Sequence, residues 1–351
     1  MEKHARLNYV DVCKALGIIL VILGHTYDTP FSLYSSIYSF HMPLFFILAG
    51  FVYNREKNNC IGFGKYTVKL CKQYLIPYYI FSFANLALDV LLKTLYFRTP
   101  LRTDYLLVNF RGILLCYSNM SNMPNCSPVW FLMCLFIASL LFWWIQKLDF
   151  KISWIPVLGC VAVNFLILPY CESHTSFPFK FPTFLLAVFY LYIGYTLRMI
   201  LDRNYQAMKG KFTSFVALVL IVVCLFTVVI TENLIGMNEN QYGNYMLALI
   251  TSTVLSACVI LIAKNHPILE NRFMLWLGRN TIYIVGFNYV CRDIAIEIYY
   301  LIPVLRHFKM HWMAHFILTF VVCIGCILVC LILKSIVDRV ILIRNTQHKF
   351  I

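Results

Sequence analysis

Charged residues are scarce in this sequence, at 13% of its 351 residues. A soluble globular domain carries about a quarter charged residues, so this composition excludes the soluble globular class. Hydrophobic residues make up 61% of the chain and aromatic residues 17%. The composition predicts an all-α membrane protein, because a helix satisfies all of its own backbone hydrogen-bonding groups in lipid.

The sequence also lacks the patterns of metal and disulfide scaffolds. Its 14 cysteines are scattered along the chain, and most lie in apolar runs, where Cys behaves as a small hydrophobe. We therefore expect no metal site, although one Cys116–Cys126 bridge stays open. The first apolar stretch has no small-residue cleavage site and more spans follow it, so we expect a transmembrane helix there and no signal peptide.

Hydropathy predicts a single bundle of about ten transmembrane helices, each with roughly the 20 apolar residues that a bilayer core requires. The chain shows no low-complexity linker and no clear internal repeat, so residues 1–351 are expected to form one polytopic domain. The predicted spans lie near residues 9–27, 36–53, 73–92, 128–146, 152–169, 182–200, 212–231, 245–263, 274–300 and 312–340.

The net charge of +14 has a simpler explanation than nucleic-acid binding. Most Lys and Arg residues fall in cytoplasmic segments if both termini are cytoplasmic, which is the orientation that the positive-inside rule favours. Residues 93–127 then form the longest outer connection. Its apolar part, TDYLLVNFRGILLCY, predicts either an interfacial or re-entrant segment or an ordinary surface helix packed on the bundle.

Ionisable side chains lie inside the first two predicted spans. Asp11, Lys14 and His25 occur in the first span, and His41 lies in the second. Such groups are costly in hydrocarbon and mark functional sites. Lys14 and His25 are eleven residues apart, which returns to one helix face about 16 Å further along the axis.

The two histidines are predicted to lie at similar depth, because the first two helices are antiparallel. A pair of imidazoles could exchange protons near neutral pH. The alternative is that each histidine bonds a backbone carbonyl for structural reasons. Lys14 likewise has two readings, an ion pair with Asp11 or a contact with a ligand.

A second cluster of cations precedes the third span. Lys65, Lys69 and Lys72 recur at helical spacing in GKYTVKLCKQYLIPYY. Ammonium groups at the cytoplasmic boundary suit anionic lipid headgroups, and they suit equally the phosphates of a nucleotide ligand.

These segments together resemble the acyltransferase family 3 membrane proteins, in particular the branch of fucose 4-O-acetylase-like and polysaccharide O-acetyltransferases. The resemblance covers roughly residues 6–290. It rests on YVDVCKALGIILVILGHT, FHMPLFFILAGFVY, KLCKQYLIP, VWFL and LGRNTIYIVG, in the order and spacing of the family.

The resemblance implies that His25 is catalytic and that Lys14, Lys69 and Lys72 match basic positions of the family. His25 would act as general base or carry the acyl group briefly, and His41 would orient His25 or stabilise the oxyanion. Two departures stand out. Lysine replaces arginine at the basic positions, which keeps the charge and loses bidentate geometry, and Asn288 stands where a histidine is expected.

The predicted function is O-acetyl transfer from acetyl-CoA to a sugar hydroxyl of a surface or exported glycan in the bacterial cytoplasmic membrane. Lys65, Lys69 and Lys72 would hold the donor phosphates. The expected partners are the bilayer and a glycan or lipid-linked sugar. Direct transfer and an acyl-histidine intermediate are both compatible with the sequence. Competing readings are a transporter or flippase for a lipid-linked or anionic glycan and a structural subunit of a polysaccharide assembly.

Overall fold

A computed structural model describes residues 7–26, 29–96, 98, 100, 102–117, 127–173, 177–301 and 312–347. This part of the chain is almost entirely helical, and its strands are limited to one two-stranded hairpin. The helices are α1 (Asn8–Gly24), α2 (Phe31–Tyr38), α3 (His41–Phe51), α4 (Arg55–Asn59), α5 (Phe63–Leu70), α6 (Ile76–Leu91), α7 (Thr103–Leu115), α8 (Trp130–Ile145), α9 (Trp154–Ser173), α10 (Thr183–Met208), α11 (Lys211–Ile230), α12 (Tyr245–Asn265), α13 (Arg272–Arg279), α14 (Thr281–Leu301) and α16 (Trp312–Gln347). The strands are β1 (Ile235–Gly236) and β2 (Gln241–Tyr242).

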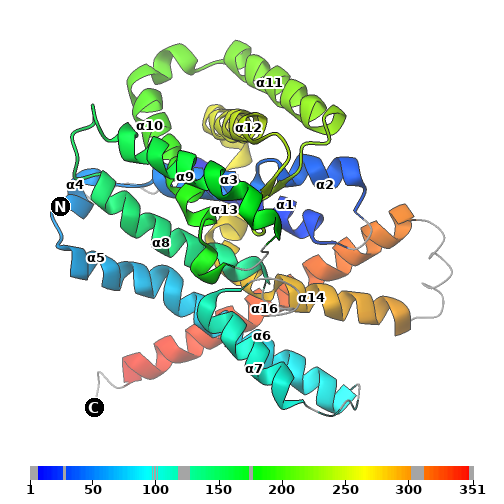
Figure 1. Cartoon of the computed structure of the whole chain (residues 1–351). Helices are drawn as coiled ribbons and strands as arrows, with labels where there is room; N and C mark the ends of the chain where they lie inside the picture. The colour runs from blue at the N-terminus through cyan, green and yellow to red at the C-terminus, as the bar shows by residue number, and fades with distance from the viewer. Residues whose placement is uncertain are drawn as a thin grey trace.

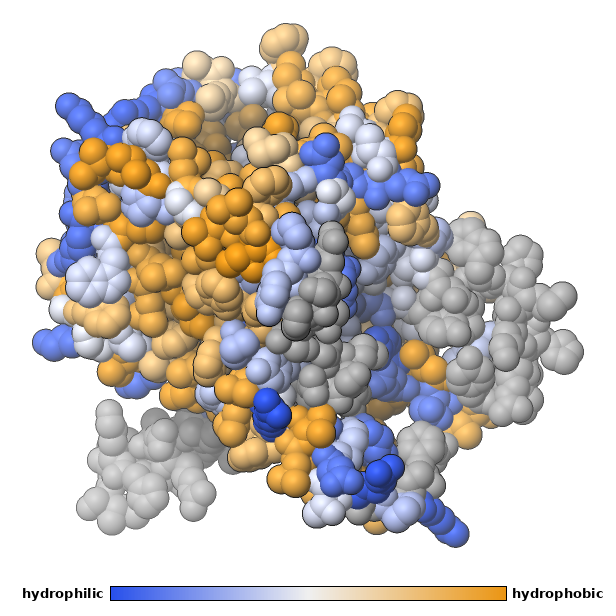
Figure 2. Space-filling model, viewed as in Figure 1, coloured by the Kyte–Doolittle hydropathy of each residue, from blue (hydrophilic) through white to orange (hydrophobic). Residues whose placement is uncertain are grey.

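Seven helical segments in the described residues are long and apolar enough to cross a membrane. They are Phe31–Phe51, Phe63–Leu95, Trp154–Cys171, Pro178–Met208, Lys211–Ile230, Tyr245–Asn265 and Phe316–Ile336. Figure 2 shows apolar side chains over the middle of one face and hydrophilic ones along its left edge. The protein is therefore an all-α membrane protein, as the composition predicts, while the count of ten spans and the orientation of the termini stay predictions.

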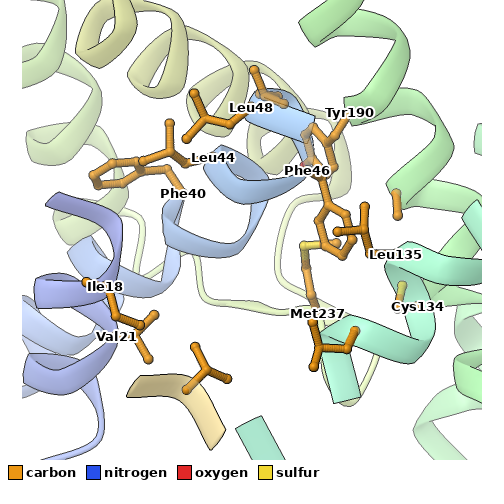
Figure 3. Close-up of a cluster of buried hydrophobic side chains, with 14 of the residues drawn as sticks. Ile18, Val21, Phe40, Leu44, Phe46, Leu48, Cys134, Leu135, Tyr190 and Met237 are labelled. Carbon is orange, nitrogen blue, oxygen red and sulfur yellow. The ribbon is translucent and has the colours of Figure 1, made fainter. Parts of the chain in front are cut away.

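Helices α1 and α3 lie at the centre of the bundle, with α11 and α12 on one side and α14 and α16 on the other (Figure 1). Helices α3 and α10 approach each other closely. A Cβ atom on Gly50 would overlap the backbone of Leu191, and one on Gly194 would overlap the backbone of Ile47. Small residues allow such close approach in membranes, so this contact fixes α3 against α10. Figure 3 shows part of the apolar cluster around α3.

Two predicted spans are divided in the structure. The stretch 36–53 contains the end of α2 and all of α3, with a break at Ser39 and Phe40. The stretch 274–300 contains α13 and α14, which meet at Asn280. Hydropathy missed both breaks because apolar residues continue on either side of them. The predicted third span, in contrast, begins earlier, because α5 and α6 join through a π-helical turn at Cys71–Leu75.

In the described part of the connection 93–127, one regular helix, α7, packs on α6. The Tyr78 hydroxyl donates to the Ile113 carbonyl oxygen at 2.7 Å, and Tyr105 donates to the carboxylate of Asp89. These contacts attach α7 to α6, and both alternatives for this segment, an interfacial or re-entrant segment and an ordinary surface helix, stay predictions. Cys116 is a buried free thiol, and Cys126 lies outside the described residues, so the bridge between them stays untested.

Candidate active site

Two cavities lie at opposite ends of α1 and α3. The first, called the histidine pocket, has a volume of about 180 Å³. The second, called the lysine cavity, has a volume of about 1130 Å³. The histidine pocket is lined in part by His25, Tyr38, His41, Trp130, Glu239 and Tyr289. The ionisable side chains of the lysine cavity include Asp11, Lys14, Arg55, Glu56, Lys57, Lys69, Arg198 and Asp202.

His25 caps the C-terminus of α1. Its backbone N–H reaches the carbonyl oxygens of Val21 and Ile22 at 3.2 Å, and its side chain is half-buried. The Nδ1 atom of its ring lies 3.0 Å from the Tyr38 hydroxyl and 3.5 Å from the Tyr289 hydroxyl. Two phenol groups therefore hold the ring through one nitrogen, which leaves Nε2 for a substrate.

His41 begins α3 and is 2% exposed. Its Nδ1 atom lies 2.9 Å from the carbonyl oxygen of Ile37, one helical turn earlier. A carbonyl oxygen only accepts, so Nδ1 carries the proton, and Nε2 of the neutral ring is then an acceptor. The carbonyl contact expected under the structural reading is thus present. The neutral ring cannot also donate to an oxyanion, so the expected oxyanion role would require the imidazolium form.

Tyr38 connects the two histidines. Its ring centroid lies 5.8 Å from that of His25 and 4.7 Å from that of His41, with edge-to-face geometry in both contacts. The structure therefore brings His25 and His41 into one pocket, as the antiparallel arrangement predicts. It also adds two tyrosines that sequence reasoning missed.

Only proximity in the sequence could have pointed to these tyrosines. Tyr38 lies three residues before His41, and Tyr289 follows Asn288, the position where a histidine was expected. Asn288 itself is fully buried and accepts from the Cys323 thiol at 3.7 Å. It does not line the histidine pocket, and Tyr289 contacts His25 in its place.

The lysine cavity gathers cations from four segments. α1 contributes Lys14, the α4 segment contributes Arg55 and Lys57, α5 contributes Lys69, and α10 contributes Arg198. Arg55 is fixed by bonds of 2.9 and 2.7 Å to two backbone carbonyl oxygens after α8. Converging cations on a large open cavity suit a ligand that carries several phosphates.

The predicted lysine stripe is only partly in this cavity. Lys69 lies nearest to the face of α5 that packs against Trp143, and it donates to the Asn58 side-chain oxygen at 3.0 Å. Lys65 and Lys72 are exposed and do not line the cavity. Their helical angles point further from the buried face, so the structure brings together Lys14 and Lys69 and leaves the other two outside.

Both readings of Lys14 have a counterpart in the structure. Its ammonium lies 3.6 Å from the Asp11 carboxylate, which is 2% exposed, and Arg279 of α13 lies 3.5 Å from the same carboxylate. Lys14 is partly exposed and also lines the lysine cavity. The ion pair thus leaves part of the ammonium available to a ligand, while Arg279 shares the task of neutralising Asp11.

An aromatic ring lies between the two cavities. On α1, Lys14 and His25 are separated by about 16 Å, and Gly17 and Val21 lie near the face between them. The ring of Phe45 packs against Gly17, at 3.0 Å from the position that a Cβ atom would take. Phe45 also lines the histidine pocket, so its ring contacts both that pocket and the stretch of α1 that leads to Lys14.

A pocket of imidazoles at one end of a membrane helix pair and a cationic cavity at the other suit an enzyme that transfers a group within the membrane. The family model of an acyltransferase domain matches residues 7–335, which is nearly the whole chain. Among curated proteins none is significantly similar to this sequence. The chain belongs to acyltransferase family 3, and it is a multi-pass membrane acyltransferase.

Proposed function

We propose that the protein transfers an acetyl group from acetyl-CoA to a sugar hydroxyl of a surface or exported glycan, in the cytoplasmic membrane of a bacterium. The observation that carries the proposal is the placement of His25 and Lys14 at opposite ends of one face of α1. The first lies in a pocket of a size suited to a small acceptor, and the second lies in a large cationic cavity. Membership of an acyltransferase family supplies the reaction class.

The donor would enter from the lysine cavity. Its phosphates would meet Lys57, Lys69 and Arg198, which line that cavity, and an extended pantetheine arm would carry the thioester past Lys14 towards the histidine pocket. Ammonium and guanidinium groups form charge-assisted hydrogen bonds with phosphate. Lys65 and Lys72 would add long-range attraction from the exposed surface.

The acyl transfer itself would occur in the histidine pocket. Nε2 of His25 accepts the proton of the acceptor hydroxyl while the hydroxyl oxygen attacks the acetyl carbonyl carbon. The new C–O bond forms, the C–S bond breaks, and the imidazolium returns the proton to the CoA thiolate. Tyr38 fixes the His25 ring through Nδ1, and His41 acts by holding the Tyr38 ring. An acyl-histidine intermediate would use the same nitrogen as nucleophile.

Purified protein in lipid nanodiscs tests the donor part of the proposal. Replacement of Lys69 by Gln should raise the Kd for acetyl-CoA, whereas the paired variant Lys65→Gln/Lys72→Gln should change it much less, because only Lys69 lines the cavity. Isothermal titration measures both values. If the two variants weaken acetyl-CoA binding equally, overall surface charge determines the affinity and the lysine cavity is not the donor site.

Glycan analysis tests the acceptor part. Mass spectrometry of surface glycans from cells with and without the protein should show the added mass of one acetyl group, and expression of the His25→Ala variant should not restore it. If the glycan profile is unchanged and acetyl-CoA binding is intact, the glycan acceptor is contradicted and the acetyl-CoA donor is retained.

A further inference from the structure

The connection between α11 and α12 folds back into the protein. Residues 235–242 form the β1–β2 hairpin, in which Ile235 pairs with Tyr242 and Gly236 with Gln241. The turn between the strands begins with Met237, which is 2% exposed and lies beside Phe46 of α3 in the apolar cluster (Figure 3). The polar connection between α11 and α12 thus contributes a buried side chain to the core beside the histidine pocket.

Buried polar side chains hold this turn in place. Thr183 donates to the Met237 carbonyl oxygen at 3.0 Å, and the Lys180 ammonium donates to the Asn238 carbonyl oxygen at 2.7 Å. A third contact joins the turn to α9, where Asn164 donates to the Asn240 side-chain oxygen at 3.0 Å.

Lys180 is 7% exposed, and Thr183 and Asn164 are 2% and 0% exposed. A buried ammonium group is costly in a membrane protein. Groups that bind a substrate, in contrast, must be held by supporting hydrogen bonds. The network therefore indicates that the hairpin presents its side chains to a ligand.

The hairpin supplies one wall of the histidine pocket. Gly236, Glu239 and Gln241 line it together with Trp130 of α8. Glu239 is exposed and lies within electrostatic range of the Tyr34 hydroxyl. Among the described residues that line the pocket, Glu239 carries the sole carboxylate.

We propose that the β1–β2 hairpin is the acceptor-recognition wall and that it selects a single sugar ring without negative charge; this inference rests on the proposed sugar acetylation. The pocket volume of about 180 Å³ suits one sugar ring. The Glu239 carboxylate can accept hydrogen bonds from ring hydroxyls, and the Gln241 amide can both accept and donate them. The Trp130 ring offers an apolar surface to the C–H face of the sugar.

The charge of Glu239 supplies the selectivity. A uronic acid would bring a second carboxylate next to it, and like charges a few ångströms apart repel each other at a partly wet site. Two cations lie near the pocket without lining it. The Lys180 ammonium is 5.6 Å from the Trp130 ring centroid and donates to the Asn238 carbonyl oxygen. Arg292 is 4.1 Å from the Tyr289 ring centroid and pairs with Asp293. Because each is engaged elsewhere, they reduce the repulsion at the ligand without removing it. A neutral sugar or an amino sugar meets no such penalty.

Binding of simple glycosides without acetyl-CoA tests the inference. Saturation-transfer NMR on the full-length protein in nanodiscs compares methyl glucoside with methyl glucuronide. The wild-type protein should bind the glucoside about tenfold more tightly, and Glu239→Gln should bring the two Kd values together. Glu232→Gln is the matched control, because Glu232 is exposed in the same connection and does not line the pocket.

Three results would overturn the inference: no glycoside bound by the wild-type protein, equal or reversed preference, or an unchanged preference in Glu239→Gln. The Kd for acetyl-CoA, measured on the same samples, should be unaffected by Glu239→Gln. If the wild-type protein does not bind acetyl-CoA, the proposed function is contradicted. If it binds acetyl-CoA but does not show the expected glycoside preference, only the inference about the hairpin is contradicted.

Discussion

At the scale of single residues, the candidate site depends on which nitrogen of each histidine is already in use. His25 and His41 both engage a neighbour through Nδ1, the first with Tyr38 and the second with the Ile37 carbonyl oxygen. The two rings differ in exposure, since His25 is half-buried and His41 is buried. The more accessible ring is therefore the better placed proton acceptor, and under the proposed mechanism His41 would act through Tyr38.

This difference predicts graded effects of substitution. His25→Ala should lower kcat for acetyl transfer by about 10²–10⁴-fold, the usual contribution of a general base, with normal membrane insertion. Tyr38→Phe should have a smaller effect, because the Tyr289 hydroxyl still lies 3.5 Å from His25 Nδ1. Initial rates at matched protein level measure both effects. Near-normal turnover by His25→Ala would show that His25 is not the general base.

Lys14 provides a second test at the residue scale. Lys14→Met should leave protein abundance near normal, because Arg279 still pairs with Asp11, and it should weaken acetyl-CoA binding. Lys14→Arg keeps the charge and should restore activity. Immunoblots of membranes and donor titrations give the two readouts. A drop in abundance that Asp11→Asn partly reverses would instead show that Lys14 is a structural partner, because that change removes the unpaired carboxylate.

At the scale of elements, most predicted spans coincide with helices of the structure, because apolar length is a direct physical requirement of the bilayer. The breaks at Ser39–Phe40 and Asn280 were not predictable from hydropathy. Each depends on local backbone geometry: Phe40 leaves the helical region with φ −149°, and the Asn280 side chain donates to the Trp276 carbonyl oxygen at 2.8 Å where α13 ends. The histidine pair followed from antiparallel topology alone.

The remaining parts of the pocket were not predictable, for a different reason. The β1–β2 hairpin is a short polar connection without periodicity, and its position depends on contacts with Asn164, Lys180 and Thr183, which are remote in sequence. Tyr289 likewise enters the pocket from α14. Such residues are identified only when the packing of the helices is known.

The contact between α3 and α10 supplies a prediction for an element. Gly50→Ala places a methyl group against the Leu191 backbone, so α3 and its His41 must move away from α10. We expect a loss of stability of at least about 1–3 kcal/mol, as for overpacked cores. Gly159→Ala in α9 is the control, since its Cβ atom would meet open space. Thermal unfolding in detergent compares the variants, and equal Tm values would contradict the close contact.

At the scale of the whole molecule, two separate cavities lie where the proposed function requires a donor and an acceptor. The lining residues of the lysine cavity and the histidine pocket do not overlap, and α1 and α3 extend from one to the other. Under the proposed function, a thioester that enters beside Lys14 would pass Gly17, where the Phe45 ring lies. The same ring would prevent water from the acceptor side from reaching the thioester before a sugar is bound.

Removal of this ring should therefore uncouple hydrolysis from transfer. Phe45→Ala is expected to leave the Kd for acetyl-CoA unchanged and to raise the rate of acetyl-CoA hydrolysis in the absence of acceptor, because water can then reach the thioester. Phe131→Ala is the matched control, since Phe131 also lines the histidine pocket, with its ring centroid 6.0 Å from that of Phe45, but is not among the atoms nearest to Gly17. Release of free CoA thiol measures hydrolysis. If Phe45→Ala hydrolyses the donor no faster than Phe131→Ala does, Phe45 is a packing residue, and the passage between the two cavities must follow another face of α1.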